Sequence, residues 1–257
     1  MLNSIVNIYR TVVKNIQYNN QIVEFIGEIL STCKQINAYG DTLVSNRRLK
    51  TLLKHLQYRT GKTRLNTIYE LEQIAHNYPQ YHWLIMEILC KFIYAHAAST
   101  SSSPLDSCST LLIQSALDVI ARRNIQHDTE NQQLDLCHID IRGANLREAN
   151  LENANLYRIN LCGANLSQAN LCGTVLIAAD LSGANLAGAN LSYSILSAAN
   201  LTGANLSRTN LTGANLYLAS LQEAILYETK LNGANLREVK FTTSDNSNNH
   251  PISTQHL

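Results

Sequence analysis

Residues 199–216 read ANLTGANLSRTNLTGANL, and this five-residue pattern decides the fold. From Leu136 to Phe241 an aliphatic or aromatic residue occupies every fifth position, and 20 of these 22 residues are Leu. In the 19 repeats centred on Leu146 to Leu236, the residue two positions before the centre is Ala in 14, and the residue between the two is Asn in 13. Such a fixed period predicts a solenoid, in which each repeat packs only on its neighbours.

The period of five fits neither regular secondary structure. A helix places apolar residues about 3.6 positions apart, and a strand places them at every second position. Ala and Leu are two positions apart, so both can point inward from a short extended segment while the Asn between them points outward. The two remaining residues must turn the chain. Gly143, Gly163, Gly183 and Gly203 suit this turn, because Gly adopts backbone angles that other residues avoid.

The tandem A(N/D)LXX units at 134–243 resemble the pentapeptide-repeat family. This resemblance implies a right-handed quadrilateral β-helix with four repeats, or about 20 residues, in each coil. The expected fold class is therefore mainly β with an α domain in front. The repeats would make about 5.5 coils, and at the roughly 4.8 Å spacing of hydrogen-bonded strands the rod would be about 25 Å long.

Residues 1–125 follow a helical pattern instead. Apolar residues recur at helical spacing in six stretches: 5–16, 22–30, 49–56, 65–74, 83–93 and 111–123. Pro79 is well placed to begin the fifth of these helices. We therefore predict four segments: an α-helical domain at 1–125 that covers the first coil, a linker at 126–133, the β-helix at 134–243 and a disordered polar tail at 244–257.

Three stretches in the first half, Arg64–Ala75, Ile85–Leu89 and Ser115–Arg123, resemble the helical segment that precedes the repeats in many bacterial members of the family. Several of those proteins carry membrane-spanning helices further upstream. This sequence has no apolar run of about 18 residues and no signal peptide, so we expect a cytoplasmic protein without a transmembrane segment. The resemblance implies a fold for this segment and no activity.

No motif indicates a catalytic, cofactor or metal site. The sequence lacks a nucleophile elbow, a P-loop and a dinucleotide-binding glycine motif, and its six cysteines include no C-x-x-C pair. His76, His82 and His96 lie on predicted helices without a metal-like partner four residues away. The flat walls of a β-helix provide no concave pocket for a substrate. We therefore expect a protein that is not an enzyme and that binds no cofactor.

Function must then lie on the walls of the rod, and one wall differs from the other three. The Leu156 wall consists of the repeats centred on residues 156, 176, 196, 216 and 236. Its outward positions carry apolar side chains: Tyr157, Val175, Ile177, Ile195, Tyr217 and Leu218. Two of these residues, Val175 and Ile195, replace the usual Asn one coil apart. Such a surface is covered either by the chain's own helical domain or by a partner.

The C-terminal end of the rod is a second candidate surface. The repeats stop at Phe241, and the residues that follow are too polar to form a capping helix. We expect the last coil, with Ile225, Tyr227 and Leu236, to be partly open. Relatives in the family pair through their C-terminal coils. The expected partner is another protein or a second copy of this chain, with homodimerisation through the side wall or the C-terminal coil.

Some members of the family mimic duplex DNA and bind gyrase, which is an alternative function. Mimicry requires a strongly acidic rod, because duplex DNA carries one charge per about 1.7 Å. Residues 134–241 hold eight acidic and seven basic residues, a net charge of −1 (7 − 8). The whole chain has a net charge of +1, so direct binding to nucleic acid is also disfavoured.

A second alternative is binding to an anionic surface through the basic stretch between Thr42 and Tyr69, which contains no acidic residue. Its candidate anion-binding side chains share one predicted helix: Arg47, Arg48, Lys50 and Lys54. The competing interpretation is a solvated helix face whose charges pair with acidic residues elsewhere, such as Glu70 and Glu72. The sequence leaves both interpretations open.

Overall fold

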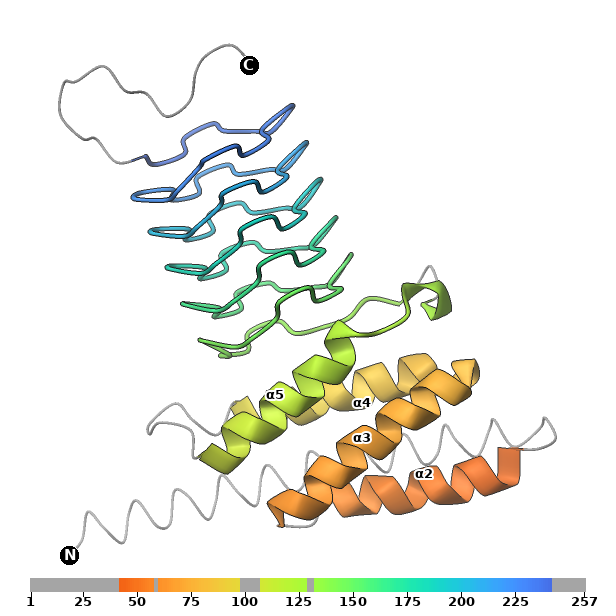
Figure 1. The fold of residues 1–257 in the computed structure, drawn as a ribbon. Helices are drawn as coiled ribbons and strands as arrows, with labels where there is room; N and C mark the ends of the chain where they lie inside the picture. Colours follow the sequence, from red (N-terminus) through yellow and green to blue (C-terminus); the bar gives the residue numbers. More distant parts are fainter. Residues whose placement is uncertain (1–41, 58–59, 98–106, 129–131, 242–257) are drawn as a thin grey trace, which may run out of the picture.

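The computed structural model describes residues 42–57, 60–97, 107–128 and 132–241. A group of helices comes first in the chain, and a stack of coils rests on it (Figure 1). The helices predicted at 5–16 and 22–30 and the tail predicted at 244–257 lie outside the described residues. The division into separately folding domains remains a prediction.

Four helices and one short 3₁₀ turn are described: α2 (Thr42–Gln57), α3 (Gly61–Asn77), α4 (Pro79–Ala97), α5 (Ser107–Ala121) and η3 (Ile125–His127). The helices predicted at 49–56, 65–74 and 83–93 are confirmed, and each extends beyond its apolar stretch. Pro79 begins α4 as predicted, because its fixed φ suits the first turn and its missing N–H has no partner to lose there. None of the helices in the described part of the chain is long and apolar enough to span a membrane.

The region after α5 differs from the prediction. The last helix was expected at 111–123, but it runs from 107 to 121. Part of the predicted linker at 126–133 is ordered, because η3 begins within one residue of its start. The Asn124 side chain caps this turn by accepting a hydrogen bond from the Gln126 N–H at 3.0 Å.

The helical core follows from the apolar stripes in the sequence. Helix α4 packs against α3, α5 and η3, and α2 packs against α3. The central helix α4 buries residues around most of its circumference, including Tyr81, Ile85, Met86, Leu89 and Ile93. Within 47–56, where the structure describes side chains of α2, the buried face consists of Leu49, Leu52, Leu53 and Leu56.

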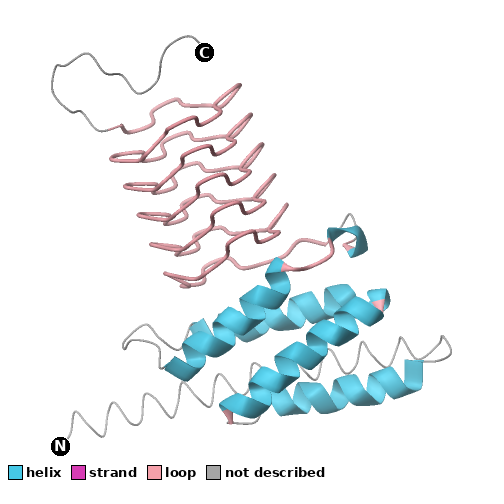
Figure 2. Ribbon diagram, viewed as in Figure 1, coloured by secondary structure: helices cyan, strands magenta, loops and turns pink. Residues whose placement is uncertain are grey.

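The coils have the predicted period of 20 residues. Parallel bridges join each outward residue to the residue 20 positions later, as in Asn145↔Asn165 and Asn165↔Asn185. Each side of a coil pairs through a single residue, so Figure 2 colours the stack as loops rather than as strands. The central Leu residues from Leu146 to Leu221 are at most 2 % exposed, which confirms that they point inward. The right-handed sense of the helix remains an implication of the family resemblance.

The chain turns between successive repeats through residues with a positive φ. In all 21 corners between His138 and Glu238, the residue two positions after the centre has a positive φ, and eight of these residues are Gly (13 + 8 = 21). The predicted role of the glycines is confirmed, with φ of +69° at Gly143 and +66° at Gly203. A backbone hydrogen bond from Ala144 N–H to Ile141 O at 3.1 Å closes the first of these turns.

Two of the glycines provide a matched test of corner packing. A Cβ at Gly213 would lie 2.7 Å and 2.8 Å from two ring carbons of Tyr193, whereas a Cβ at Gly203 would meet nothing within 4 Å. We expect Gly203→Ala to lower the free energy of unfolding by about 1–2 kcal/mol through backbone strain alone. Gly213→Ala should lower it further, and Tyr193→Ala in the same chain should remove the difference. Equal losses in urea unfolding would show that the Tyr193 ring does not constrain this corner.

The outward Asn side chains form hydrogen bonds between successive coils. Asn190 donates to Asn170 Oδ1 at 3.3 Å and accepts from Asn210 Nδ2 at 3.0 Å. Its Oδ1 also accepts the backbone N–H of Ser192 at 3.3 Å, which supports the following turn. The Asn ladder therefore links successive coils on the outside of the rod, while Leu and Ala fill the inside.

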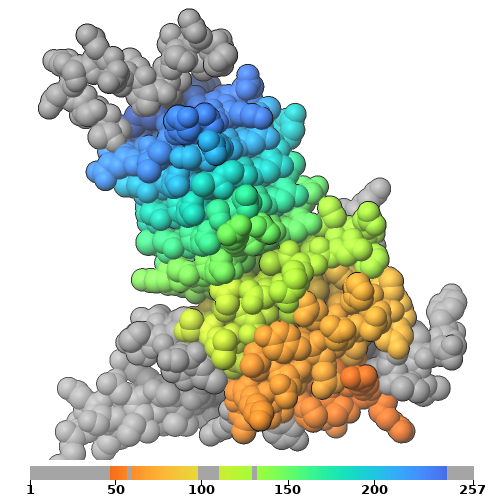
Figure 3. All heavy atoms as spheres, viewed as in Figure 1, coloured from red at the N-terminus to blue at the C-terminus, as the bar shows by residue number. Residues whose placement is uncertain are grey.

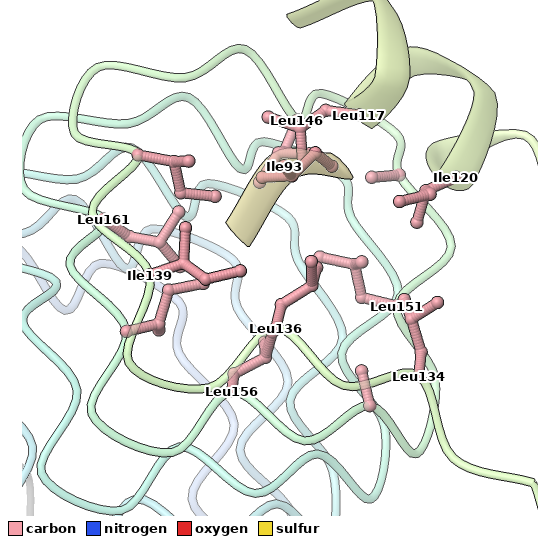
Figure 4. Close-up of a cluster of buried hydrophobic side chains, with 14 of the residues drawn as sticks. Ile93, Leu117, Ile120, Leu134, Leu136, Ile139, Leu146, Leu151, Leu156 and Leu161 are labelled. Carbon is pink, nitrogen blue, oxygen red and sulfur yellow. The ribbon is translucent and has the colours of Figure 1, made fainter. Parts of the chain in front are cut away.

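The described helices cover the first coil. Figure 4 shows Ile93 from α4 and Leu117 and Ile120 from α5 facing apolar side chains of the first coils. Gln114 on α5 donates to Asn145 O at 2.7 Å and accepts from Asn145 N–H at 3.0 Å. Backbone groups at the start of the β-helix thus find partners on the helices, as the edge of a β structure requires.

Candidate interaction surface

The Leu156 wall is open in the described part of the chain. Figures 1 and 3 show the described helices at one end of the stack. Ile195 is 37 % exposed and Leu218 is 42 % exposed, although both are apolar. Val175 pairs with Ile195 through a β-bridge, so these two side chains lie on neighbouring coils. The remaining predicted residues of the wall are half-buried: Tyr157, Val175, Ile177 and Tyr217.

The structure adds one residue that the sequence analysis missed. Tyr193 is 68 % exposed and has a positive φ of 58°, so it projects from a corner. The corner belongs equally to the wall before it and to the Leu156 wall after it. Inspecting corner residues with both neighbouring walls would have identified it. We define the apolar stripe as Val175, Ile177, Tyr193, Ile195, Tyr217 and Leu218.

The stripe interrupts the outward hydrogen-bonding pattern. Asn155 Oδ1 accepts the Tyr157 N–H at 3.2 Å, and Asn215 Oδ1 accepts the Tyr217 N–H at 3.1 Å. Between these coils stand Val175 and Ile195, whose side chains have no acceptor for the corresponding N–H groups. The inward residues beside them are polar instead. Thr174 and Ser194 are buried, and their hydroxyls each donate to the backbone O of a preceding Leu at 2.7 Å (Leu171 and Leu191).

The repeated sequence of the coils matches a known family model. The family model for pentapeptide repeats matches in eight copies, at residues 139–176, 154–192, 179–216 and 204–242. The coils at 139–242 are pentapeptide repeats. No curated protein matches its sequence.

Several solved pentapeptide-repeat structures resemble part of this chain. Rfr23 from the cyanobacterium Cyanothece 51142 is 34 % identical, and the match covers 38 % of this chain and 63 % of Rfr23, with a TM-score of 0.32. HetL from the cyanobacterium Nostoc sp. strain PCC 7120, which is involved in heterocyst differentiation regulation, is 32 % identical (42 % and 62 % covered, TM-score 0.27). QnrB1, a plasmid-mediated fluoroquinolone resistance protein, is 21 % identical (43 % and 59 % covered, TM-score 0.30). The matches span less than two thirds of each of these proteins.

The last pentapeptide coil forms a second apolar region. Its inward residues Leu226, Leu236 and Phe241 are half-buried, whereas the equivalent residues in the middle of the stack are buried. Phe241 is an inward residue, so it does not join the apolar stripe. Ile225 and Tyr227 are exposed on the opposite wall. The last coil is therefore more exposed than the inner coils, as its sequence predicted.

One edge of the Leu156 wall is aromatic and polar. Tyr157 packs edge-on against His138, with ring centroids 5.1 Å apart, and the Arg158 guanidinium lies 5.3 Å from the centre of its ring. Tyr217 at the other end donates from its hydroxyl to Glu238 Oε1 at 3.4 Å. The apolar stripe is thus bordered by polar groups at both ends, as is common for binding surfaces.

The four predicted anion-binding residues lie on α2, whose apolar face packs inside the helical core. Arg47, Arg48 and Lys54 are exposed, and Lys50 is half-buried. Arg48 forms an ion pair with Glu70 at 3.1 Å, as the solvated-face interpretation predicted. Glu72 pairs with Arg122, the residue after α5, at 2.8 Å instead of with the basic stretch. Surface pairs of this kind contribute about 0–1 kcal/mol.

The described residues contain no group of three His, Cys, Asp or Glu side chains that could hold a metal ion. Four cysteines are described as free thiols, and burial raises the pKa of the Cys90 thiol to about 12. A thiol with this pKa is a poor nucleophile at neutral pH.

A hollow of about 440 Å³ lies between α4 and the first coil, lined by Trp83, Cys90, Tyr94, Asp135 and Cys137 among others. The Asp135 carboxylate in this hollow already accepts the Cys137 N–H and the Asn155 side-chain amide.

Proposed function

We propose that this pentapeptide-repeat protein is a non-catalytic protein-interaction or scaffolding module, and that its partner binds the apolar stripe. The observation that carries the proposal is the exposure of Tyr193, Ile195 and Leu218 on adjacent coils of one wall. Clustered apolar residues on a solvent-exposed surface are typical of binding sites. The coils behind them are held by continuous backbone hydrogen bonds, so the surface is preorganised for a partner.

The departure from the repeat supports the same proposal. Asn at positions 175 and 195 would continue the ladder between Asn155 and Asn215, and it would accept two further backbone N–H groups. Val175 and Ile195 forgo these hydrogen bonds, each worth about 0.5–1.5 kcal/mol, and expose apolar area. Local rules of this kind are broken most often at functional sites. We infer that binding, rather than folding, accounts for these two residues.

We propose a second copy of this chain as the first partner to test. An apolar stripe on a flat wall can pack against its own copy about a two-fold axis. The exposed last coil, with Ile225, Tyr227 and Phe241, offers an alternative contact for the same partner. A dimer through the side wall and a dimer through the C-terminal coil would be disrupted by different substitutions.

Light scattering of the purified full-length chain should report a dimer or a larger species. Val175→Asp together with Ile195→Asp should lower the mass if the stripe is the interface, because two carboxylates would be buried without partners. Asp fits the outward position of the repeat that Val175 and Ile195 occupy. Asp180 occupies the same position in another repeat, where it accepts the Ser182 N–H at 3.0 Å. Phe241→Asp should lower the mass instead if the C-terminal coil is the interface. A strict monomer at high concentration would contradict self-association.

The gyrase-related alternative makes a separate prediction. Arg142 and Arg208 each form an exposed ion pair on the rod, with Asp140 and Glu228 respectively, so even the acidic residues are partly neutralised. A nearly neutral rod lacks the charge density of a duplex. We therefore expect no effect of the purified protein in a gyrase supercoiling assay. Inhibition or protection of gyrase in that assay would favour the DNA-mimic alternative.

A further inference from the structure

A buried polar cluster connects the described helices to the first coil. Its four residues come from different parts of the chain: His82 from α4, Arg123 from the segment between α5 and η3, His127 from η3 and Asp128 from the residue after η3. The side chains of Arg123 and His82 are only 2 % and 4 % exposed. Polar groups are buried this deeply only when partners compensate for the loss of water.

Arg123 links the helical part to the first coil through side-chain hydrogen bonds. Its Nη1 donates to Asn150 O, its Nη2 donates to Glu152 O at 2.7 Å, and its Nε donates to Asp128 Oδ2 at 3.1 Å. Both carbonyl acceptors belong to the first coil. Asp128 fixes the guanidinium in this position, so the Asp128–Arg123 pair is needed for the contact with the coil.

The His82 ring lies beside the Asp128 carboxylate but forms no hydrogen bond with it. Its Nε2 lies 3.5 Å from Asp128 Oδ1, and the His127 ring packs edge-on against it with centroids 5.3 Å apart. Three buried atoms here have no hydrogen-bond partner among the described residues: His82 Nε2, His127 Nδ1 and Asp128 Oδ1. The Ala75 backbone on α3 also forms a hydrogen bond with His82. The Asp128 carboxylate can only accept, so a proton on Nε2 would let His82 donate a hydrogen bond to Oδ1 once the two atoms move closer together.

The groups around His82 determine how it responds to acid. Burial lowers the pKa of His82 below its ordinary value of 6.5, and the charges of His127 and Arg123 act in the same direction. Asp128 and the Ala75 backbone oppose this shift without reversing it. The unfolded chain thus binds a proton on this residue more readily than the folded chain, so stability falls as the pH drops below about 6.5.

We propose that this cluster is an acid-sensitive latch, in which protonated His82 draws the Asp128 carboxylate toward its Nε2 and away from Arg123, and so loosens the helices from the first coil. Arg123 then loses the partner that orients it toward Asn150 O and Glu152 O. The coil edge that the helices cover, including the Asn145 and Asn150 backbone groups, becomes accessible to solvent or to a partner. The latch does not depend on which partner binds the apolar stripe.

Hydrogen exchange of the full-length protein tests the latch. The Asn150 N–H bonds to Ala121 O at 2.9 Å, so its exchange reports separation of α5 from the first coil. After correction for intrinsic rates, exchange in this segment should rise several-fold between about pH 7.5 and about pH 5. His82→Gln should remove this rise, whereas His76→Gln, an exposed control on α3, should retain it. An unchanged rise in His82→Gln would overturn the proposal.

A measurement on the unaltered protein covers the case in which His82→Gln does not fold. Nuclear magnetic resonance titration of the histidine rings should show His82 titrating below the ordinary histidine pKa of 6.5. The midpoint of the His82 titration should coincide with the rise in Asn150 exchange. A His82 ring with a pKa at or above 6.5, or exchange that is the same at both pH values, would overturn the latch.

Discussion

A chain that begins at residue 126 is expected to melt far below the full-length protein and to aggregate. It would lack α5, whose Leu117 and Ile120 cover the first coil, and α4, which contributes Ile93 (Figure 4). Exposing each buried Leu or Ile of that coil costs about 1.5–3 kcal/mol. The uncovered residues are Leu134, Leu136, Ile139, Leu146 and Leu151.

The truncation would also remove hydrogen-bond partners from the coil edge. Gln114 satisfies both backbone groups of Asn145, and Arg123 satisfies two carbonyls of the first coil. Calorimetry of residues 126–257 beside the full chain measures the loss, with residues 1–243 as a truncation control at the other end. If residues 126–257 proved as soluble and heat-stable as the full chain, the helices would not act as a cap.

Leu186→Ala should have one of the largest effects of any single substitution within the rod. Leu186 is 0 % exposed and lies in the middle of the stack, where coils above and below limit any collapse into the cavity. We expect a loss of about 2–5 kcal/mol in the free energy of unfolding. Leu206→Ala, at the equivalent position one coil later and equally buried, should behave in the same way.

Asn190→Ser is the matched outward control for Leu186→Ala. The substitution weakens the ladder through Asn170 and Asn210, which is worth about 0.5–1.5 kcal/mol for a hydrogen bond that is partly exposed to water. Urea unfolding of both variants gives the comparison directly. Similar losses at the two positions would mean that the inward and outward positions of the repeat have been misassigned.

Most of the β-helix could be predicted because the same inward and outward positions recur in every repeat. The spacing of Ala and Leu determines which side chains point inward. The family resemblance implied a coil of 20 residues, and the bridge Asn145↔Asn165 confirms it. The helical segments 49–56, 65–74 and 83–93 were also readable, because their apolar stripes have the period of a helix. These features depend on neighbours in sequence or on an exact repeat.

Features that depend on several elements meeting were not predictable. Tyr193 was missed because a corner residue faces two walls, and its exposure becomes visible only when the coils are stacked. The sequence analysis treated His82 as an ordinary helical histidine, and the structure places it beside Asp128 of the predicted linker. Arg123, expected inside a helix, instead follows its end and reaches the first coil. No periodicity encodes contacts between positions so far apart in the chain.

The measurement that tests the interaction proposal most directly is the mass and thermal stability of Val175→Asn with Ile195→Asn. These substitutions restore the family repeat, so the variant should melt at or above the temperature of the unaltered protein. Removal of the two aliphatic side chains should nevertheless reduce its mass in light scattering to the 28.6 kDa of one chain. Asn165→Ser with Asn185→Ser, a pair on the opposite wall, should leave the mass unchanged. A restored variant that keeps the mass of the unaltered protein, or an unaltered protein that stays at 28.6 kDa, would contradict self-association through the apolar stripe.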